Sequence, residues 1–275
     1  MKRTALFAIA FILVAGTVRA QQVPQAPLGT TPADTAAEGP KAASMTPRQI
    51  AEMRADLMMA RKDYAEAAKA YQTILIDDRH NVTVLNHLGM AYQALKELDL
   101  AERYYKLALR VDKGSSDTLN NLGTLEDANE RYGKAIKYYR KAIAIGNAKA
   151  TVYTNLGYAY CAAKEYPKAL DSFNKALAID PHVFDQTGNF GSILQLRSSP
   201  DPAAVDFTLA KSYAKSGDAE HAARYLKKAR DEGYKEFRTA EKDPDFALVI
   251  KDPRIQEILQ RQPAFAAQPR KPVAN

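Results

Sequence analysis

The amino-acid sequence predicts an all-α fold, a solenoid of helix-turn-helix units with a helical segment that closes its C-terminal end. Three observations lead to this prediction. A block of 34 residues recurs without a gap, small and aromatic residues inside each block follow the 3.6-residue period of an α-helix, and no proline occurs between Pro47 and Pro167. Because each unit of such an array contacts only its neighbours, the sequence indicates one array and not two globular domains.

The composition is that of an ordinary folded protein, and it excludes several classes. Of 275 residues, 46% are hydrophobic and 26% are charged, which rules out a collagen-like or wholly disordered chain. The net charge of +7 is modest for this length, so nucleic-acid binding is not favoured. A single Cys excludes an intramolecular disulfide and a multi-cysteine metal site.

Residues 1–20 have the form of a secretory signal peptide. Lys2 and Arg3 precede an apolar run over 5–16, and small residues lead up to Gln21. We therefore expect a bacterial protein that is exported to the periplasm or secreted. The apolar run is shorter than the about 20 residues that cross a bilayer. An uncleaved anchor is thus the less favoured alternative, and membrane contact is expected only through such an anchor.

Two terminal segments have compositions typical of disorder. Residues 21–45 are rich in Pro, Ala and Thr, and they contain few large apolar side chains to bury. They are expected to form a disordered linker, and residues 263–275 a disordered tail. Removal of the signal peptide would lower the net charge from +7 to +4, because three basic residues and no acidic residue precede Gln21.

The repeat covers residues 46–183 as four blocks, at 48–81, 82–115, 116–149 and 150–183. Each block has a small residue, an alanine twelve positions later, and an aromatic residue four positions after that alanine. These spacings predict two amphipathic helices joined by a short turn, with the small residues allowing close approach and the aromatic residue packing against the next block. The aligned triplets are Ala55, Ala67 and Tyr71; Gly89, Ala101 and Tyr105; Gly123, Ala135 and Tyr139; and Gly157, Ala169 and Phe173.

The pattern Leu-Gly-x-x-Tyr followed by Ala-x-x-x-Phe, with the ending Asp180-Pro181, resembles the tetratricopeptide repeat. The chain departs from that family in two ways. Glu126 stands where an aromatic residue is usual, and we expect a locally open or solvated seam there. The early Trp of the family is replaced in successive blocks by Leu85, Leu119 and Tyr153.

Helix boundaries follow from capping residues. Thr46 and Gln49 flank Pro47 in the pattern of a capping box, so the folded region is expected to begin at residue 46. Asp63 is expected to cap the second helix of the first block, and Pro167 to lie at the start of a helix.

The register breaks after block four. Residues 184–202 form an insertion, expected to be a loop packed over the array, and 203–236 restore the pattern as a fifth repeat. Residues 237–262 contain two Asp-Pro starts of short helices, and they are expected to cap the array.

No motif in the sequence indicates catalysis. The four His residues have no metal-ligand spacing, and the glycine-rich loops that hold phosphates are absent. We therefore expect no enzyme activity, no catalytic residue, no metal, no cofactor and no small-molecule substrate. Cys161 is expected to be a small, partly buried side chain, with a reactive thiol as the alternative.

The family resemblance implies that the first helix of each block lines a concave groove and that the second lies outside. In blocks two to four the net formal charge of the first helices is −3 and that of the second helices is +6. The groove is therefore expected to be neutral to acidic. We expect a protein or peptide partner there and a role as a non-catalytic scaffold or adaptor. The groove candidates are Thr83, His87, Met90, Gln93, Asp117, Asn121, Thr124, Asp127, Thr151, Asn155 and Tyr158.

Two other functions remain open at this point. The chain could be an accessory or regulatory subunit of an envelope enzyme or assembly machine, with its function in the insertion at 184–202 or at Cys161. Nucleic-acid binding through the basic outer residues around 134–141 is the least favoured, because it requires a strong, salt-dependent electrostatic interaction.

Overall fold

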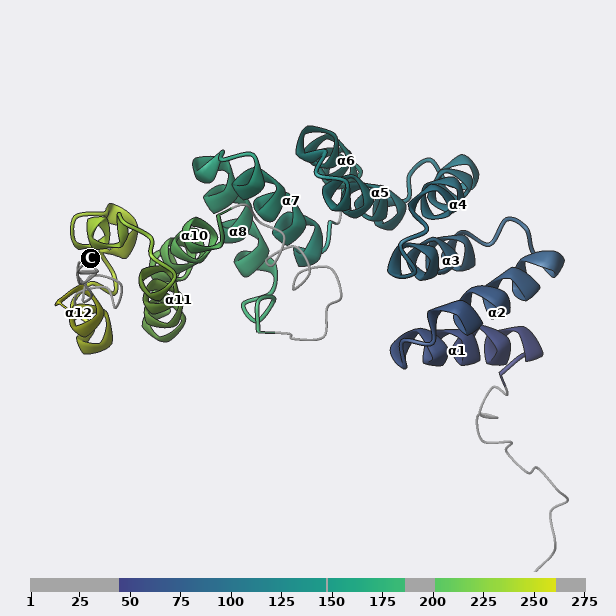
Figure 1. Cartoon of the computed structure of the whole chain (residues 1–275), viewed down its shortest axis with the longest axis horizontal. Helices are drawn as coiled ribbons and strands as arrows, with labels where there is room; N and C mark the ends of the chain where they lie inside the picture. The colour runs from purple at the N-terminus through teal and green to yellow at the C-terminus, as the bar shows by residue number, and fades with distance from the viewer. Residues whose placement is uncertain (1–44, 147, 186–200, 261–275) are drawn as a thin grey trace, which may run out of the picture. The chain divides into compact units, whose positions relative to one another are not determined.

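A computed structural model describes residues 45–146, 148–185 and 201–260, and it contains helices but no strand in these ranges (Figure 1). Residues 45–275 belong to one compact unit. The expected signal peptide at 1–20, nearly all of the linker, most of the insertion and the tail from 263 lie outside the described residues.

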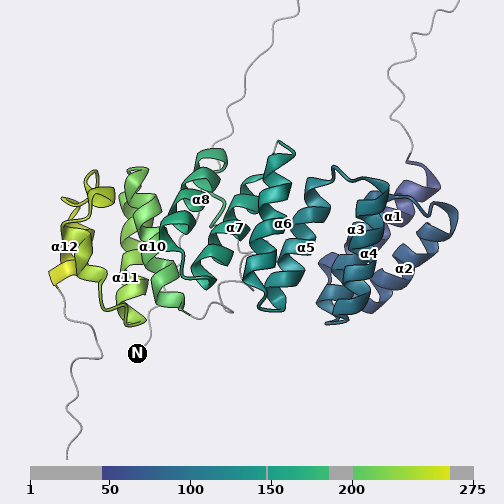
Figure 2. The ribbon, with the colours of Figure 1, turned by 90° about the horizontal axis from the view of Figure 1, so that it is seen from above.

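The helices form hairpins, and each helix packs chiefly against its neighbours in the sequence (Figure 2). The prediction of an all-α array is thereby confirmed. Each hairpin falls within one expected block, to within one residue at its start. The hairpins are α1 (Pro47–Ala60) with α2 (Tyr64–Asp77), α3 (Val82–Ala94) with α4 (Leu98–Val111), α5 (Ser116–Ala128) with α6 (Tyr132–Ala144), α7 (Ala150–Ala162) with α8 (Tyr166–Ile179), and α10 (Pro202–Lys215) with α11 (Ala219–Asp231).

The turn inside each hairpin places one residue in the left-handed backbone region. In α3–α4 this residue is Lys96, at φ 63°. The next residue, Glu97, donates its backbone N–H to the carbonyl of Tyr92 at 2.9 Å, which is the hydrogen bond of a Schellman turn. The other hairpins place Lys62, Glu130, Lys164 and Gly217 at the equivalent position.

Capping explains where α1 begins, as expected. The Gln49 backbone N–H donates to Thr46 Oγ1 at 3.2 Å, and the Thr46 N–H donates to Gln49 Oε1 at 2.8 Å, so the capping box is confirmed. Pro167 lies in the first turn of α8, also as predicted. The expected cap at Asp63 is wrong, because its side chain makes no capping hydrogen bond. Its backbone N–H instead closes the Schellman turn after α1.

The aromatic residue of each block is core, as predicted: Tyr71, Tyr105, Tyr139 and Phe173 are at most 1% exposed. The packing of the glycine differs from the expectation. A Cβ atom added to Gly123 would lie 2.3 Å from Cε1 of Tyr139, in the same hairpin. The glycine therefore makes room for the ring of its own block, in addition to bringing the two helices together.

The expected open seam at Glu126 is wrong. Glu126 is 7% exposed, and its carboxylate lies 3.5 Å from the Arg131 guanidinium just beyond the helix. A buried carboxylate is tolerated only where an opposite charge or a hydrogen-bond donor reaches it. The seam between neighbouring helices is thus closed at this position.

Three short elements follow the last hairpin. They are η1 (Phe237–Glu241), η2 (Pro244–Phe246) and α12 (Pro253–Gln260), of which the sequence indicated the last two. Phe246 and Ile255 are fully buried in the cluster that includes Leu226 of α11, so these elements cover the end of the hairpins. Within the described ranges, no helix has the length and apolar character that crossing a membrane requires.

Candidate partner-binding face

The face that the family resemblance assigns to binding is carried by α3, α5 and α7. The structure places the eleven predicted residues on these three helices, at equivalent positions of successive blocks. Thr83, Met90 and Asp117 are exposed; His87, Gln93, Asn121, Thr124, Asp127 and Thr151 are partly exposed; Asn155 and Tyr158 are buried.

Tyr158 does not line an open groove, contrary to the prediction. Its ring is 7% exposed and lies edge-on to Phe173 and Phe184, with ring centroids 5.3 and 6.4 Å away. Burial raises the pKa of its hydroxyl well above the usual value. Phe184 follows the last helix of block four, so the sequence of α7 alone gave no sign of this cover.

Asn155 is also buried, because it connects neighbouring helices. Its Nδ2 donates to Asn120 Oδ1 at 2.9 Å, which joins α7 to α5. One hairpin earlier, Asn86 Nδ2 donates to Thr118 Oγ1 at 2.8 Å, which joins α3 to α5. These amides fix the spacing between the first helices of neighbouring blocks. The prediction that Asn155 is available at the surface is therefore wrong.

Two of the predicted residues hold buried tyrosines. The Tyr105 hydroxyl donates to Gln93 Oε1 at 2.9 Å, and the Tyr139 hydroxyl donates to Asp127 Oδ2 at 2.8 Å. Gln93 and Asp127 occupy the same place in consecutive blocks. A buried hydroxyl needs an acceptor, so this pairing gives both residues a structural role besides any contact with a partner.

Asp127 has an unusual ionisation. Burial raises the pKa of its carboxyl to about 7, although the hydrogen bond from Tyr139 works in the opposite direction. A carboxyl with this pKa is protonated in a large fraction of molecules near neutral pH. The raised pKa of one carboxyl does not by itself make a catalytic site.

Charges on the exposed part of the face are paired within the protein. The Lys149 ammonium lies 2.9 Å from both oxygens of Asp117, and His87 Nδ1 lies 2.9 Å from Asp56 Oδ1. The surface that remains is polar and nearly neutral. It offers hydroxyl and amide groups that both donate and accept hydrogen bonds, as a peptide backbone does.

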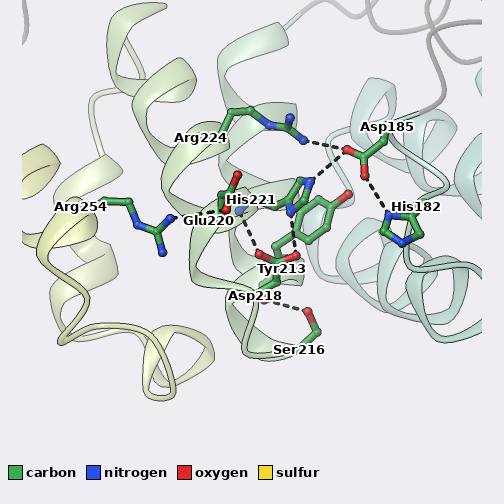
Figure 3. A network of polar contacts seen from close by, with 9 residues as sticks. All are labelled: His182, Asp185, Tyr213, Ser216, Asp218, Glu220, His221, Arg224 and Arg254. Atoms are coloured by element: carbon green, nitrogen blue, oxygen red, sulfur yellow. Dashed lines mark hydrogen bonds and ion pairs between the residues drawn. The ribbon is translucent and has the colours of Figure 1, made fainter. Parts of the chain in front are cut away.

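A polar network that the sequence analysis missed joins the start of the insertion to α11 (Figure 3). Asp185 accepts hydrogen bonds from Arg224 Nη2 at 2.9 Å and from His221 Nε2 at 3.0 Å, and His182 Nδ1 lies 3.2 Å from it. Burial opposes ionisation of Asp185, but the Arg224 and His182 hydrogen bonds lower its pKa overall. His221 Nδ1 also lies 2.7 Å from Asp218. Only the two local spacings, His182 to Asp185 and Asp218 to His221, are visible in the sequence.

A second missed feature is an ion pair between α10 and α11 in which the carboxylate is buried and the ammonium is exposed. Asp206 is fully buried, and its Oδ2 lies 3.1 Å from Lys228 Nζ. Burial raises the pKa of its carboxyl, and the Lys228 ammonium opposes the rise. Breaking such a pair leaves a buried charge uncompensated, so the pair fixes how the last hairpin closes.

Cys161 is 1% exposed, and burial raises the pKa of its thiol to about 12, against a hydrogen bond from Thr208. A reactive thiol requires access and a depressed pKa, so this geometry is contrary to the reactive alternative. Across the described residues, no group of three or more His, Cys, Asp or Glu side chains is arranged to hold a metal ion.

Comparison with known proteins identifies the repeats. Residues 83–148 and residues 117–182 each match the family model described as tetratricopeptide repeat. No curated protein matches the sequence.

Solved structures with a similar fold include PilF of Pseudomonas aeruginosa, PilW and MamA. PilF is 19% identical with a TM-score of 0.52, and the match covers 76% of this chain and 95% of PilF. PilW, described as a type IV pilus biogenesis factor, is 18% identical with a TM-score of 0.49, covering 77% of this chain and 98% of PilW. MamA is 24% identical with a TM-score of 0.45, covering 66% of this chain and 95% of MamA.

The family match lies over α3 to α8, where the 34-residue period, the glycine beneath each aromatic ring and the Schellman turns are also found. The fold shared with PilF extends beyond that region. Residues 83–182, which span α3 to α8, are therefore tetratricopeptide repeats.

Proposed function

We propose that the chain is a non-catalytic scaffold or adaptor that binds a protein or peptide segment on the face of α3, α5 and α7. One observation carries this proposal: side chains at equivalent positions of α3, α5 and α7, most of them polar, remain exposed or partly exposed. A surface that repeats with the helices suits an extended partner, because equivalent contacts recur along it. The repeated sets are Thr83, Asp117 and Thr151; His87 and Asn121; and Met90 and Thr124.

Site-specific photo-crosslinking in the native host tests this proposal. A photoreactive residue in place of Met90 or Thr124 is expected to crosslink the partner. The same residue in place of Lys134, an exposed position on α6, is the matched control. Crosslinks to the same partner from position 134 but not from 90 or 124 would contradict the proposal. Circular dichroism of each variant checks that the helices are intact.

We also propose that the chain works in the bacterial envelope or outside the cell, on the basis of the pattern in residues 1–20. The intact mass of the protein from its native host tests this. A mature N-terminus at Gln21 is expected, and a protein that keeps residues 1–20 and stays in the cytoplasm would refute export.

A further inference from the structure

An apolar hollow of about 750 Å³ lies on the second helices, away from the proposed groove residues. Its apolar lining comes from Leu109 of α4, Leu119 of α5, and Ala144 and Ile145 at the end of α6. Its polar lining is entirely basic, and consists of Lys106, Arg110, Lys113 and Lys141.

A similar hollow of about 700 Å³ lies one hairpin earlier. It is lined by residues of α2, α3 and α4, with Leu85 in the place that Leu119 has in the first hollow. Arg110 lines both hollows, so the two adjoin. We call the two hollows and their basic lining the outer strip. Because it recurs with the 34-residue period, it is a property of the repeat and not of one loop.

Large apolar side chains on the outer strip are exposed to solvent. Ile76, Val111 and Ile145 are 71%, 42% and 45% exposed, and each lies at the C-terminal end of a second helix. Single exposed apolar residues are common, but exposed apolar residues gathered around hollows indicate an interaction site.

The cations of the outer strip are largely unpaired. Arg79, Arg110, Lys113 and Lys141 form no ion pair with a described residue, whereas Lys106 pairs with Glu102 at 2.6 Å. Arg110 and Lys141 lie in the last turns of α4 and α6, where they also interact favourably with the helix dipole. Lys113 lies between α4 and α5, directly after the C-cap Asp112 of α4.

We propose that the outer strip binds an acidic segment of a partner protein, which inserts large apolar side chains into the two hollows. The surrounding cations match carboxylates of the partner, and the concave apolar floors accept side chains. A flat bilayer surface fits a pair of hollows less well. The chain's own tail at 263–275 has two basic residues and no acidic residue, so its charge does not match the strip.

Binding of designed peptides to the full chain tests the proposal. The probe is a labelled synthetic peptide of Glu, Leu and Phe with helical periodicity, and the control peptide has Lys in place of every Glu. Fluorescence anisotropy is expected to show binding of the Glu peptide only, weakened by added salt. Equal binding of the Lys peptide would overturn the proposal. So would binding of phosphatidylglycerol vesicles without binding of the Glu peptide, which would assign the strip to a membrane.

Three variants locate the binding. Lys113→Glu reverses a lining charge, and Leu119→Tyr fills the floor with the residue that Tyr153 supplies in the next block. Each is expected to raise the Kd of the Glu peptide by about tenfold. Lys137→Glu makes the same charge change on α6 outside the lining, and it is expected to leave the Kd unchanged. Equal weakening by Lys137→Glu and Lys113→Glu would show attraction by net charge alone and would overturn the proposal.

The other acidic segment that could occupy the outer strip is the chain's own N-terminal segment, which contains Asp34 and Glu38. A chain that lacks residues 1–44 is expected to bind the Glu peptide with unchanged affinity. A gain in affinity would show that the N-terminal segment occupies the strip, and the proposal would then be wrong. Thermal unfolding monitored by circular dichroism confirms that Leu119→Tyr and the truncated chain remain folded.

Discussion

Pairs of residues within one block explain much of the sequence variation between blocks. Where the buried ring is Tyr105 or Tyr139, the residue four positions after the glycine is Gln93 or Asp127, and it accepts the hydroxyl proton. Phe173 has no hydroxyl and needs no acceptor. The residue of its block that is equivalent to Gln93 and Asp127 is Cys161. In blocks two and three the hydroxyl of the buried ring is thus paired within its own block.

The contact between glycine and ring predicts a large effect of Gly123→Ala. The added Cβ would lie 2.3 Å from the Tyr139 ring, so the ring or the helix must move. The free energy of unfolding is expected to fall by roughly 1–3 kcal/mol, as for other overpacked cores. Urea unfolding measures the change.

Gly133→Ala is the matched control for this substitution. Gly133 lies in α6, and an added Cβ there meets no atom within 4 Å. Alanine is the better helix former, so this variant is expected to gain about 0.5–1 kcal/mol. Destabilisation of similar size at both positions would refute the role of the Tyr139 ring.

The raised pKa of Asp127 predicts a pH dependence of stability. Its pKa is about 7 in the folded chain and about 3.8 when exposed, so between these values the folded state binds the proton more tightly. This carboxyl therefore makes the protein less stable as the pH rises from 3.8 to about 7, with no further change above that window.

Asp127→Asn is expected to remove this contribution, because the amide stays neutral and its oxygen still accepts from Tyr139. The free energy of unfolding of the variant, measured by urea titration across the window, should fall less with rising pH than that of the parent chain. A parallel pH profile in both proteins would show that Asp127 is ionised normally.

The sequence could predict which residues of the face are repeated, but not which are covered. Met90, Thr124 and Tyr158 are equivalent in the period, yet only Tyr158 is buried. Its cover, Phe184, comes from the start of the insertion, where the repeat gives no guidance. The acceptors of Tyr105 and Tyr139 also escaped prediction, because their partners lie twelve residues away on another helix.

Among the elements, the hairpin turns show how the repeat ends its first helices. Four turns place a non-glycine residue at positive φ, and the α10–α11 turn places Gly217 there at φ 83°. A residue with a Cβ is strained in this region, and glycine is not. The starts of α1 and α8 were predictable from Thr46 and Pro167. Asp63 makes no side-chain capping hydrogen bond, although Asp218 at the equivalent position of the α10–α11 turn does cap α11.

Lys96→Gly tests this account of the turns. It relieves the strain at φ 63°, and it is expected to raise the free energy of unfolding by about 0.5–1 kcal/mol. Lys106→Gly, in the middle of α4, is the control and is expected to lower it by about 1 kcal/mol. Urea unfolding compares the two, and a loss of stability in both variants would show that the turn does not favour glycine.

The two proposed binding sites lie on separate surfaces of the array. The face of α3, α5 and α7 is polar with its charges paired internally, whereas the outer strip is apolar and basic with few pairs. This separation of charge follows from the repeat, because the net formal charge in the central blocks is −3 for the first helices and +6 for the second helices. The sequence predicted this division of charge, but the hollows depend on how neighbouring helices pack.

The polar network at Asp185 has a consequence for protein engineering. The chain before residue 186 is tied to α11 through Arg224 and His221, and the chain after residue 200 is capped into α10 by Asp201. Each end thus has an anchor among the described residues. Since the entropy cost of a loop grows slowly with its length, a fluorescent reporter domain spliced between these anchors should leave the hairpins intact.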